Sequence, residues 1–262
     1  MKIKFLIVLL MGAMLSGCYS VPTYNEVSYN SYDELSSEAQ NWGFVRKKGT
    51  APEVDTKQVS MLGAYDGYYM DTSGKKVLYL TFDEGYENGY TSKILDVLAV
   101  NKVSAAFFVT GPYLEKQADL ICRMRDEGHI IGNHTVNHIN MASSDTETVK
   151  KELSDLDKMC SDLYGVKMEY VRPPEGTFSE KSLAISRDMG YKTILWSFAY
   201  CDWDVNKQQG AKYAYDSVVP YLHDGAIILL HAVSSDNAQA LDDIIKYAKK
   251  EGYQFRSLRE LE

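Results

Sequence analysis

Short apolar runs of β-strand type alternate with longer segments of helical periodicity along most of the chain after residue 60. Runs of the first kind cover 77–82, 105–110, 130–133, 168–172, 193–198 and 226–230. Segments with the spacing of a helix face cover 91–99, 113–127, 144–163, 179–189, 211–222 and 237–250, and several begin at Ser, Thr or Asn and end at Gly. Repeated strand and helix units predict an α/β fold with a parallel sheet, open or closed.

The beginning of the chain has the pattern of an export signal. Lys2 and Lys4 precede an apolar run over 5–15, which is too short to span a bilayer comfortably and is typical of a secretory signal. The run ends in Leu15-Ser16-Gly17-Cys18, which resembles the lipobox of bacterial lipoproteins. This resemblance implies a signal peptide over 1–17, acylation of Cys18 and durable attachment to the outer face of the bacterial cell membrane. The alternative is an ordinary signal peptide in which Cys18 is incidental.

Residues 18–60 are rich in Tyr, Asn, Ser, Glu and Lys and have little periodicity, which predicts a tether or a loosely packed arm. Trp42-Gly43-Phe44 is an exception, and we expect it to pack on the domain because large apolar side chains are usually buried. The main domain is expected over 61–262. A chain of 262 residues with 45% apolar content can bury one sizeable core of this kind.

Charge and cysteine content exclude several classes of partner. The formal net charge of −8 leaves no basic face that could follow a phosphate backbone, so nucleic acid is not expected as a partner. Beyond Cys18, the cysteines Cys122, Cys160 and Cys201 are scattered and form no CxxC pair. This pattern argues against a disulfide framework and against a thiolate metal site.

The first apolar run ends abruptly in acidic residues and glycine. Phe82 is followed by Asp83, Glu84, Gly85 and Tyr86. A buried strand that delivers carboxylates to the rim of a sheet or barrel has this pattern. A helix cap or a solvated turn also has it, so the other strand ends must decide whether the site is catalytic.

Two histidines follow the third apolar run. His134 and His138 are four residues apart, and on one helical turn two such side chains share a face and can bind one ion. A single histidine at such a place is more often structural, so the pair is the signal. His129 and His223 lack a comparable partner, and we expect them on the surface beside helix ends.

The remaining runs also end in residues able to do chemistry. The fourth leads into Arg172-Pro173-Pro174-Glu175, a stiff exit in which a guanidinium could hold a carboxylate. The fifth leads to Asp202 and Trp203, and the sixth to His231. Each alone has a structural explanation, such as a surface arginine, a packed aromatic or a capping histidine. Catalytic groups of parallel α/β folds gather at the carboxyl ends of strands, so the series predicts an active site and favours a closed or nearly closed barrel.

These residues resemble the five ordered motifs of polysaccharide deacetylases with NodB homology, carbohydrate esterase family 4. The matching segments, in chain order, are 81–85, 134–138, 172–176, 202–203 and 229–231. The longer strings TFDEGYENGYT, EGHIIGNHTVNH and IILLHAVSSDNA resemble the delta-lactam-biosynthetic de-N-acetylases, which act on muramic acid in spore cortex peptidoglycan. The resemblance implies a distorted, incomplete (β/α) barrel of about seven strands, a spore-forming bacterium and peptidoglycan glycan strands as substrate.

The resemblance also implies a metal site. It makes His134, His138 and Glu84 the ligands of a divalent ion, for which zinc is expected and cobalt or manganese are alternatives. Family members usually have aspartate where this chain has Glu84, whose side chain is one methylene longer. Glu84 could reach the ion directly, act through water, or leave a site made of two histidines.

The other roles implied by the resemblance concern proton transfer and substrate binding. Asp83 is the general base with Arg172 as its orienting partner, and His231 is the general acid, tuned by Asp202. Tyr86, Trp203 and Glu175 are expected to contact the substrate, and the backbone N–H of Glu175 to stabilise the oxyanion. The muramic acid branch tends to have arginine at the position of Glu175, where it could pair with the lactyl carboxylate, which glutamate would repel.

Three alternatives to a muramic acid deacetylase stay open. One is an N-acetylglucosamine deacetylase of the same wall polymer, and another is an esterase that acts on O-acetylated sugar. The third is a wall-binding lipoprotein of weak or lost activity, suggested by Glu84 and Glu175. We expect a monomer, exported and anchored by lipid, with the forespore membrane as one location.

Overall fold

The structure is a computed structural model, and it describes residues 32–261. The described residues form one compact unit. The expected signal peptide over 1–17 and the expected lipidation site Cys18 lie outside the described residues.

The described residues contain α-helices, strands and short 3-10 helices. The strands are β1 (Gln40–Asn41), β2 (Phe44–Lys47), β3 (Thr50–Val54), β4 (Gly67–Tyr68), β5 (Val77–Glu84), β6 (Ala105–Val109), β7 (Ile130–Asn133), β8 (Tyr170–Val171), β9 (Thr177–Phe178), β10 (Lys192–Ile194), β11 (Ala226–His231) and β12 (Gln254–Phe255). The α-helices are α1 (Thr56–Ala64), α2 (Thr91–Asn101), α3 (Gly111–Lys116), α4 (Ala118–Asp126), α5 (Thr146–Tyr164), α6 (Glu180–Asp188), α7 (Ala211–Val218) and α8 (Ser235–Lys250). The 3-10 helices are η1 (Tyr32–Glu34), η2 (Pro174–Gly176), η3 (Val219–Tyr221) and η4 (Leu258–Glu260).

Seven parallel strands form a curled sheet in the order β11-β5-β6-β7-β8-β10-β4, and β12 pairs with the start of β5. The two ends of this sheet meet through isolated bridges, Phe198 with Ile228 and Met70 with Ala226. The closure is therefore incomplete, since single bridges from the residues that follow β4 and β10 replace a full ladder with β11. This arrangement confirms the expected α/β class and the distorted, incomplete (β/α) barrel.

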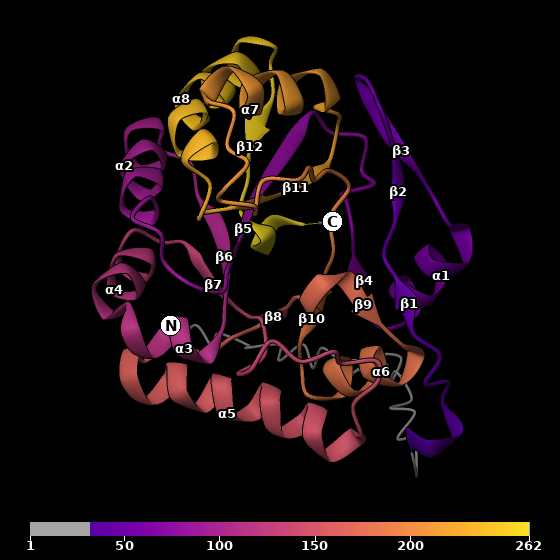
Figure 1. Cartoon of the computed structure of the whole chain (residues 1–262). Helices are drawn as coiled ribbons and strands as arrows, with labels where there is room; N and C mark the ends of the chain where they lie inside the picture. Colours follow the sequence, from indigo (N-terminus) through magenta and orange to yellow (C-terminus); the bar gives the residue numbers. More distant parts are fainter. Residues whose placement is uncertain (1–31, 262) are drawn as a thin grey trace, which may run out of the picture. The chain divides into compact units, whose positions relative to one another are not determined.

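Helices cover the outside of these strands, as Figure 1 shows for α2, α4 and α5. Both faces of β5 are buried, because alternate residues point into the helix layer and into the interior. Leu80 and Phe82 belong to the main apolar core together with Ile94 and Leu98 of α2. The residues between them on β5 face the barrel interior, and this face carries the candidate site.

Helix α5 illustrates how the sequence encodes the outer layer. Asp145 caps its first turn by accepting a hydrogen bond from the backbone N–H of Thr148, and Gly165, at φ 67°, ends it. The buried residues Val149, Leu153, Leu156, Cys160 and Tyr164 recur at the spacing of one helix face. This stripe packs against the sheet while the opposite side remains polar.

Two predicted elements differ from the structure. The single helix expected over 113–127 is two helices, α3 and α4, because Gln117 leaves the helical region of backbone space at φ −116° and ψ 43°. The strand expected over 193–198 pairs as β10 only to Ile194, after which the chain turns to bridge β11 at Phe198. That turn is the distortion that joins the two ends of the sheet.

The surface positions expected for His129 and His223 are wrong. Both histidines are buried, and each makes a hydrogen bond with a main-chain group. The Nδ1 atom of His129 accepts from the backbone N–H of Ala105 at 3.1 Å, and the ring of His223 contacts the Tyr221 carbonyl at 2.9 Å. In each case a ring nitrogen satisfies a main-chain group at the end of an element, and this contact holds the histidine inside the fold.

The stretch before Met61, expected to be largely a loosely packed arm, contains β1, β2, β3 and the start of α1. Strand β1 pairs with β9, and Trp42 is buried, as the sequence analysis expects for this aromatic. The indole N–H of Trp42 donates to the carbonyl of Trp196 at 2.8 Å. Residues 40–42 are therefore packed on the barrel next to the loop that carries Arg172 and Glu175.

Candidate active site

The site is organised around Asp83, near the carboxyl end of β5, and Arg172, which directly follows β8. The Nη1 atom of Arg172 donates to Oδ1 of Asp83 at 2.8 Å, and Nη2 donates to the hydroxyl of Thr81 at 2.9 Å. The guanidinium has no exposed surface and lies 4.2 Å from the ring centroid of Phe108. Burial alone would raise the pKa of Asp83, but Arg172, with His134 and His231 nearby, lowers it below its ordinary value. Asp83 is thus held as a carboxylate.

Two further hydrogen bonds fix the guanidinium from the neighbouring strand. Its Nε atom donates to the carbonyl of Ile194 at 3.0 Å, and Nη2 reaches the carbonyl of Leu195 at 3.5 Å. Arg172 is therefore not the surface arginine of the structural explanation. It is a buried side chain that orients Asp83 against the strand ends.

His134 and His138 lie together beside Asp83. Their ring centroids are 4.9 Å apart, and Nε2 of His134 lies 3.7 Å from Oδ2 of Asp83. The Nδ1 atom of His134 is 2.8 Å from the carbonyl of Arg172, so it carries the proton and leaves the lone pair of Nε2 free. Burial lowers the pKa of His134 to about 4, which keeps this imidazole neutral.

His231 ends β11 and is held by Asp202. The Nδ1 atom of His231 is 2.7 Å from Oδ1 of Asp202, and the backbone N–H of His231 donates to Oδ2 at 2.8 Å. Burial would lower the pKa of His231, but the hydrogen bond and charge of Asp202, with Asp83 beyond, raise it above its ordinary value. Asp202 therefore favours the protonated form of this imidazole.

Asp83 and His231 lie near the ends of neighbouring strands. His231 of β11 and Asp83 of β5 are directly paired in the parallel register of these two strands. Side chains that share a register position point to the same face of a parallel sheet. Both side chains therefore face the same part of the barrel mouth, which is the end of the barrel formed by the carboxyl ends of the strands.

The residues expected to contact substrate are the exposed ones at this edge. Trp203 is 52% exposed, and its ring centroid lies 5.6 Å from that of His231. Tyr86 is 54% exposed and follows β5. Glu175 is exposed in η2 and adopts a left-handed backbone at φ 58°, an uncommon conformation for a residue other than glycine. All three are accessible to a polymeric ligand.

Glu84, expected as a metal ligand, does not lie with His134 and His138 in the structure. It has no exposed surface, and neither carboxylate oxygen has a hydrogen-bond partner. Asp83 points into the barrel, so the next residue of the same strand points to the helix side. Burial raises the pKa of Glu84 well above its ordinary value, with smaller contributions from Glu87 and Asp83.

Two supporting residues escaped the sequence analysis as parts of the site. Asn237 of α8 donates from Nδ2 to Oδ2 of Asp202 and to the carbonyl of His231. The hydroxyl of Thr81 accepts a hydrogen bond from Arg172 and donates one to the carbonyl of Ile228. An Asn just beyond the His231 strand is the only sequence signal for the first, and Thr81 was visible only as part of the motif.

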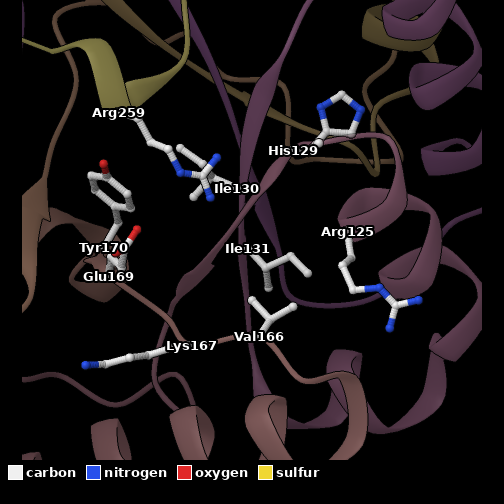
Figure 2. A pocket seen from close by; sticks show the side chains of 10 residues that line it. Arg125, His129, Ile130, Ile131, Val166, Lys167, Glu169, Tyr170 and Arg259 are labelled. Carbon is white, nitrogen blue, oxygen red and sulfur yellow. The ribbon is translucent and has the colours of Figure 1, made fainter.

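A cavity of about 130 Å³ lies at the opposite end of the strands, where β7 and β8 begin. Figure 2 shows Arg125 and Lys167 pointing away from one another, with Arg259 above Ile130. The cations do not converge on one point, and none of the candidate active-site residues lines this cavity. The chemistry of the carboxyl edge is therefore separate from it.

The residues of the carboxyl edge fit a metal ion only in part. The histidine pair offers a neutral ring with a free Nε2 atom beside a second ring, which suits a divalent ion such as zinc. Within residues 32–261, no group of three or more His, Cys, Asp or Glu side chains is arranged to hold a metal. The shortfall is the third ligand, because Glu84 lies on the other face of β5.

The fold and the site together define a class of protein. A parallel, incompletely closed barrel presents an arginine-held aspartate and an aspartate-held histidine at neighbouring strand ends. One group can accept a proton and the other can donate one, which is the arrangement of an enzyme that hydrolyses its substrate by acid and base catalysis.

Comparison with known proteins then gives the family. Residues 70–194 match the family Polysaccharide deacetylase. The chain is similar to the peptidoglycan-N-acetylmuramic acid deacetylase PdaA of Bacillus subtilis, with 45% identity over 87% of this chain and 88% of PdaA. It is also similar to a peptidoglycan-N-acetylglucosamine deacetylase of Bacillus cereus, with 31% identity over 72% of this chain and 89% of that protein. The solved structure of B. subtilis PdaA, a family 4 carbohydrate esterase, has a TM-score of 0.84 and covers 87% of this chain and 98% of its own, at 44% identity.

The chain belongs to the polysaccharide deacetylase family, carbohydrate esterase family 4.

Proposed function

We propose that the chain removes N-acetyl groups from the sugars of peptidoglycan glycan strands, with N-acetylmuramic acid as the preferred sugar. The single observation that carries the proposal is the facing pair of Asp83 and His231, each held in its working protonation state by a partner. The 45% identity with a protein named for N-acetylmuramic acid deacetylation supports the choice of sugar. The product would enter formation of muramic-delta-lactam in spore cortex.

N-acetylglucosamine is the second candidate sugar, and Glu175 favours it. This carboxylate is exposed at the edge of the site, where the lactyl carboxylate of a muramoyl group would meet a like charge. A glucosamine residue lacks that carboxylate. The similarity to a protein named for N-acetylglucosamine deacetylation supports this alternative.

The residues of the chain account for the proton transfers of amide hydrolysis. Asp83 takes a proton from the attacking water, and the new C–O bond forms at the acetyl carbon. His231 gives a proton to the sugar nitrogen as the C–N bond breaks, so that acetate and a free amine are released. Arg172 holds Asp83 ionised and aimed, and Asp202 holds His231 protonated.

A metal ion would be held by His134 and His138, whose rings lie beside Asp83. A divalent ion bound there would supply a Lewis acid for the acetyl carbonyl and lower the pKa of a bound water. We propose zinc, with cobalt or manganese as alternatives. Trp203 and Tyr86 would support the sugar rings from either side of the site, because exposed aromatic faces suit the apolar faces of sugars.

The test measures acetate released from purified glycan strands by the wild type and by Asp83→Asn and His231→Ala. Each variant should lose about 10²–10⁴ in rate. Asp204→Asn is a matched control, because the carboxylate of Asp204 pairs with Lys207 at 2.9 Å and accepts from the backbone N–H of Asn206, and neither partner belongs to the site. This variant should keep full activity. A chelator should lower the rate, and zinc should restore it.

The alternatives give different outcomes in the same assay. Absence of acetate release with zinc, cobalt or manganese would overturn the enzyme proposal. Glycan retention that is equal in the wild type, Asp83→Asn and His231→Ala, without turnover in any of them, would indicate a wall-binding protein. Faster release from O-acetylated than from N-acetylated sugar would indicate an esterase.

We propose in addition that the chain is exported and anchored by lipid at Cys18, on the basis of the sequence pattern that ends there. Among residues 32–261, no helix is long and apolar enough to cross a membrane. The full chain should partition into the detergent phase of Triton X-114 after expression in a bacterium, and Cys18→Ala should not. Equal partitioning of the two chains would contradict the anchor.

A further inference from the structure

Glu84 sits on the face of β5 that belongs to the helix-side core. Leu80 and Phe82, four and two residues before it, are members of that core. Thr81 and Asp83 lie on the other face, where both contact Arg172. Because side chains alternate along a strand and β5 continues through Glu84, this carboxyl group is directed away from the barrel mouth.

Pairing with the neighbouring strand β6 independently places Glu84 on the helix side of β5. Glu84 is in register with Val109 of β6, and Asp83 with Phe108. Val109 belongs to the helix-side core, whereas Phe108 packs its ring against the guanidinium of Arg172. Register partners in a parallel sheet share a face, so the two strands agree on which side Glu84 lies.

The electrostatic neighbours of the two carboxyl groups are also different. Arg172, His134 and His231 act on the pKa of Asp83. None of these three is among the groups that act on Glu84, whose neighbours are Glu87 and Asp83 itself. On the helix side, Glu84 acts on the pKa of Tyr113.

We infer that Glu84 does not bind the metal ion, and that the metal site of this chain consists of His134 and His138 without a third protein ligand from β5. This inference rests on the proposed function only in taking those two histidines as the metal-binding pair. Glu84 is instead a buried side chain of the helix-side core, both of whose oxygens lack a partner. A site with two protein ligands leaves more coordination positions for water and substrate than one with three.

The experiment measures zinc binding by the full chain, with a chromogenic chelator as competitor and no substrate present. Glu84→Gln should bind zinc with a Kd within about twofold of the wild type, because the substitution keeps the shape of the side chain and removes only a group that the ion does not touch. His138→Ala should weaken binding by about tenfold or more, which is typical for loss of a metal-binding contact. The absorption spectrum of the cobalt-loaded protein should be the same in Glu84→Gln and the wild type.

Glu84→Asp separates the two explanations further. The resemblance makes aspartate at this position a ligand, so a side chain directed at the ion should bind at least as tightly when shortened. On the helix side of β5, the shorter side chain only leaves a gap, so zinc affinity should not change while thermal stability falls. Tenfold weaker zinc binding in Glu84→Gln, or tighter binding in Glu84→Asp, would overturn the inference.

Thermal unfolding in the presence of a chelator gives a readout without any metal. Glu84→Met should raise the unfolding midpoint, because an apolar side chain replaces a buried carboxyl without hydrogen bonds. A lower midpoint would overturn the assignment to the core. If the wild type binds no zinc, the metal part of the proposed function fails, and the midpoint of Glu84→Met still decides where the side chain belongs.

Discussion

Arg172 is the side chain whose removal should affect stability most clearly. It has no exposed surface, it pairs with Asp83 at 2.8 Å, and it donates to the hydroxyl of Thr81 and the carbonyl of Ile194. We consider Arg172→Met, which keeps much of the volume and removes every donor. Loss of one partner from a buried ion pair costs about 3–5 kcal/mol, because the other charge is left uncompensated.

A second contribution comes from the main chain. The carbonyl of Ile194 loses its donor, and an unsatisfied buried acceptor costs about 1–3 kcal/mol. Together the two terms give about 4–8 kcal/mol, which is a large part of the roughly 5–15 kcal/mol that stabilises a typical protein. The variant should therefore unfold at much lower urea concentration than the wild type. Tryptophan fluorescence is a suitable signal, since the ring of Trp196 lies 5.5 Å from the guanidinium.

A second variant shows how much of the lost stability comes from the charge of Asp83 that is left without a partner. Arg172→Met combined with Asp83→Asn removes both charges, so the double variant should be more stable than Arg172→Met alone. The coupling between the two sites should reach about 2–3 kcal/mol, as for residues in direct contact. A loss below about 1 kcal/mol in Arg172→Met, or a double variant less stable than the single one, would refute the description of this pair as buried and mutually dependent.

Three further changes test other parts of the structure. Asp202→Asn removes the charge that raises the pKa of His231, so His231 should lose its proton at lower pH. The alkaline limb of the kcat/KM profile should therefore move to lower pH, and an unmoved limb would contradict the role of Asp202 in tuning His231. Trp42→Ala should destabilise the fold by about 3–5 kcal/mol in urea unfolding, because a buried indole that donates to Trp196 is lost; a loss below about 1 kcal/mol would show that the segment packs loosely. Glu175→Arg should raise the rate on muramoyl relative to glucosaminyl substrates, because a guanidinium can pair with a lactyl carboxylate, and a constant ratio would count against a part for Glu175 in sugar choice.

Much of the fold and the position of the site could be predicted from the sequence, because both depend on where apolar runs end. The runs before Asp83, His134, Arg172 and His231 are buried strands or lead directly from one, and the polar residue at each end faces the barrel mouth. Parallel strands bring such ends together whatever their separation along the chain. Closure of the sheet was harder to predict, since it depends on single bridges such as that of Phe198 rather than on a continuous apolar run.

The different placement of Asp83 and Glu84 could not be predicted from the sequence. Along β5, the apolar residues Leu78, Leu80 and Phe82 alternate with Tyr79, Thr81 and Asp83, but two adjacent carboxylates at the end of the run do not show where the strand stops. Whether Glu84 continues the strand or begins the loop depends on pairing with Val109, which lies 25 residues further along the chain. The burial of His129 has the same cause, since its partner is a main-chain group of the neighbouring strand at Ala105.

The direct pairing of His231 with Asp83 on adjacent parallel strands also affects how this enzyme can change. Neighbouring strands lie about 4.8 Å apart because their main chains are joined by hydrogen bonds. The separation of the two groups is therefore a repeat distance of the sheet, and no loop has to maintain it. Loops at this edge, including those that carry Tyr86 and Trp203, can gain, lose or exchange residues to fit a different glycan while Asp83 and His231 keep their spacing.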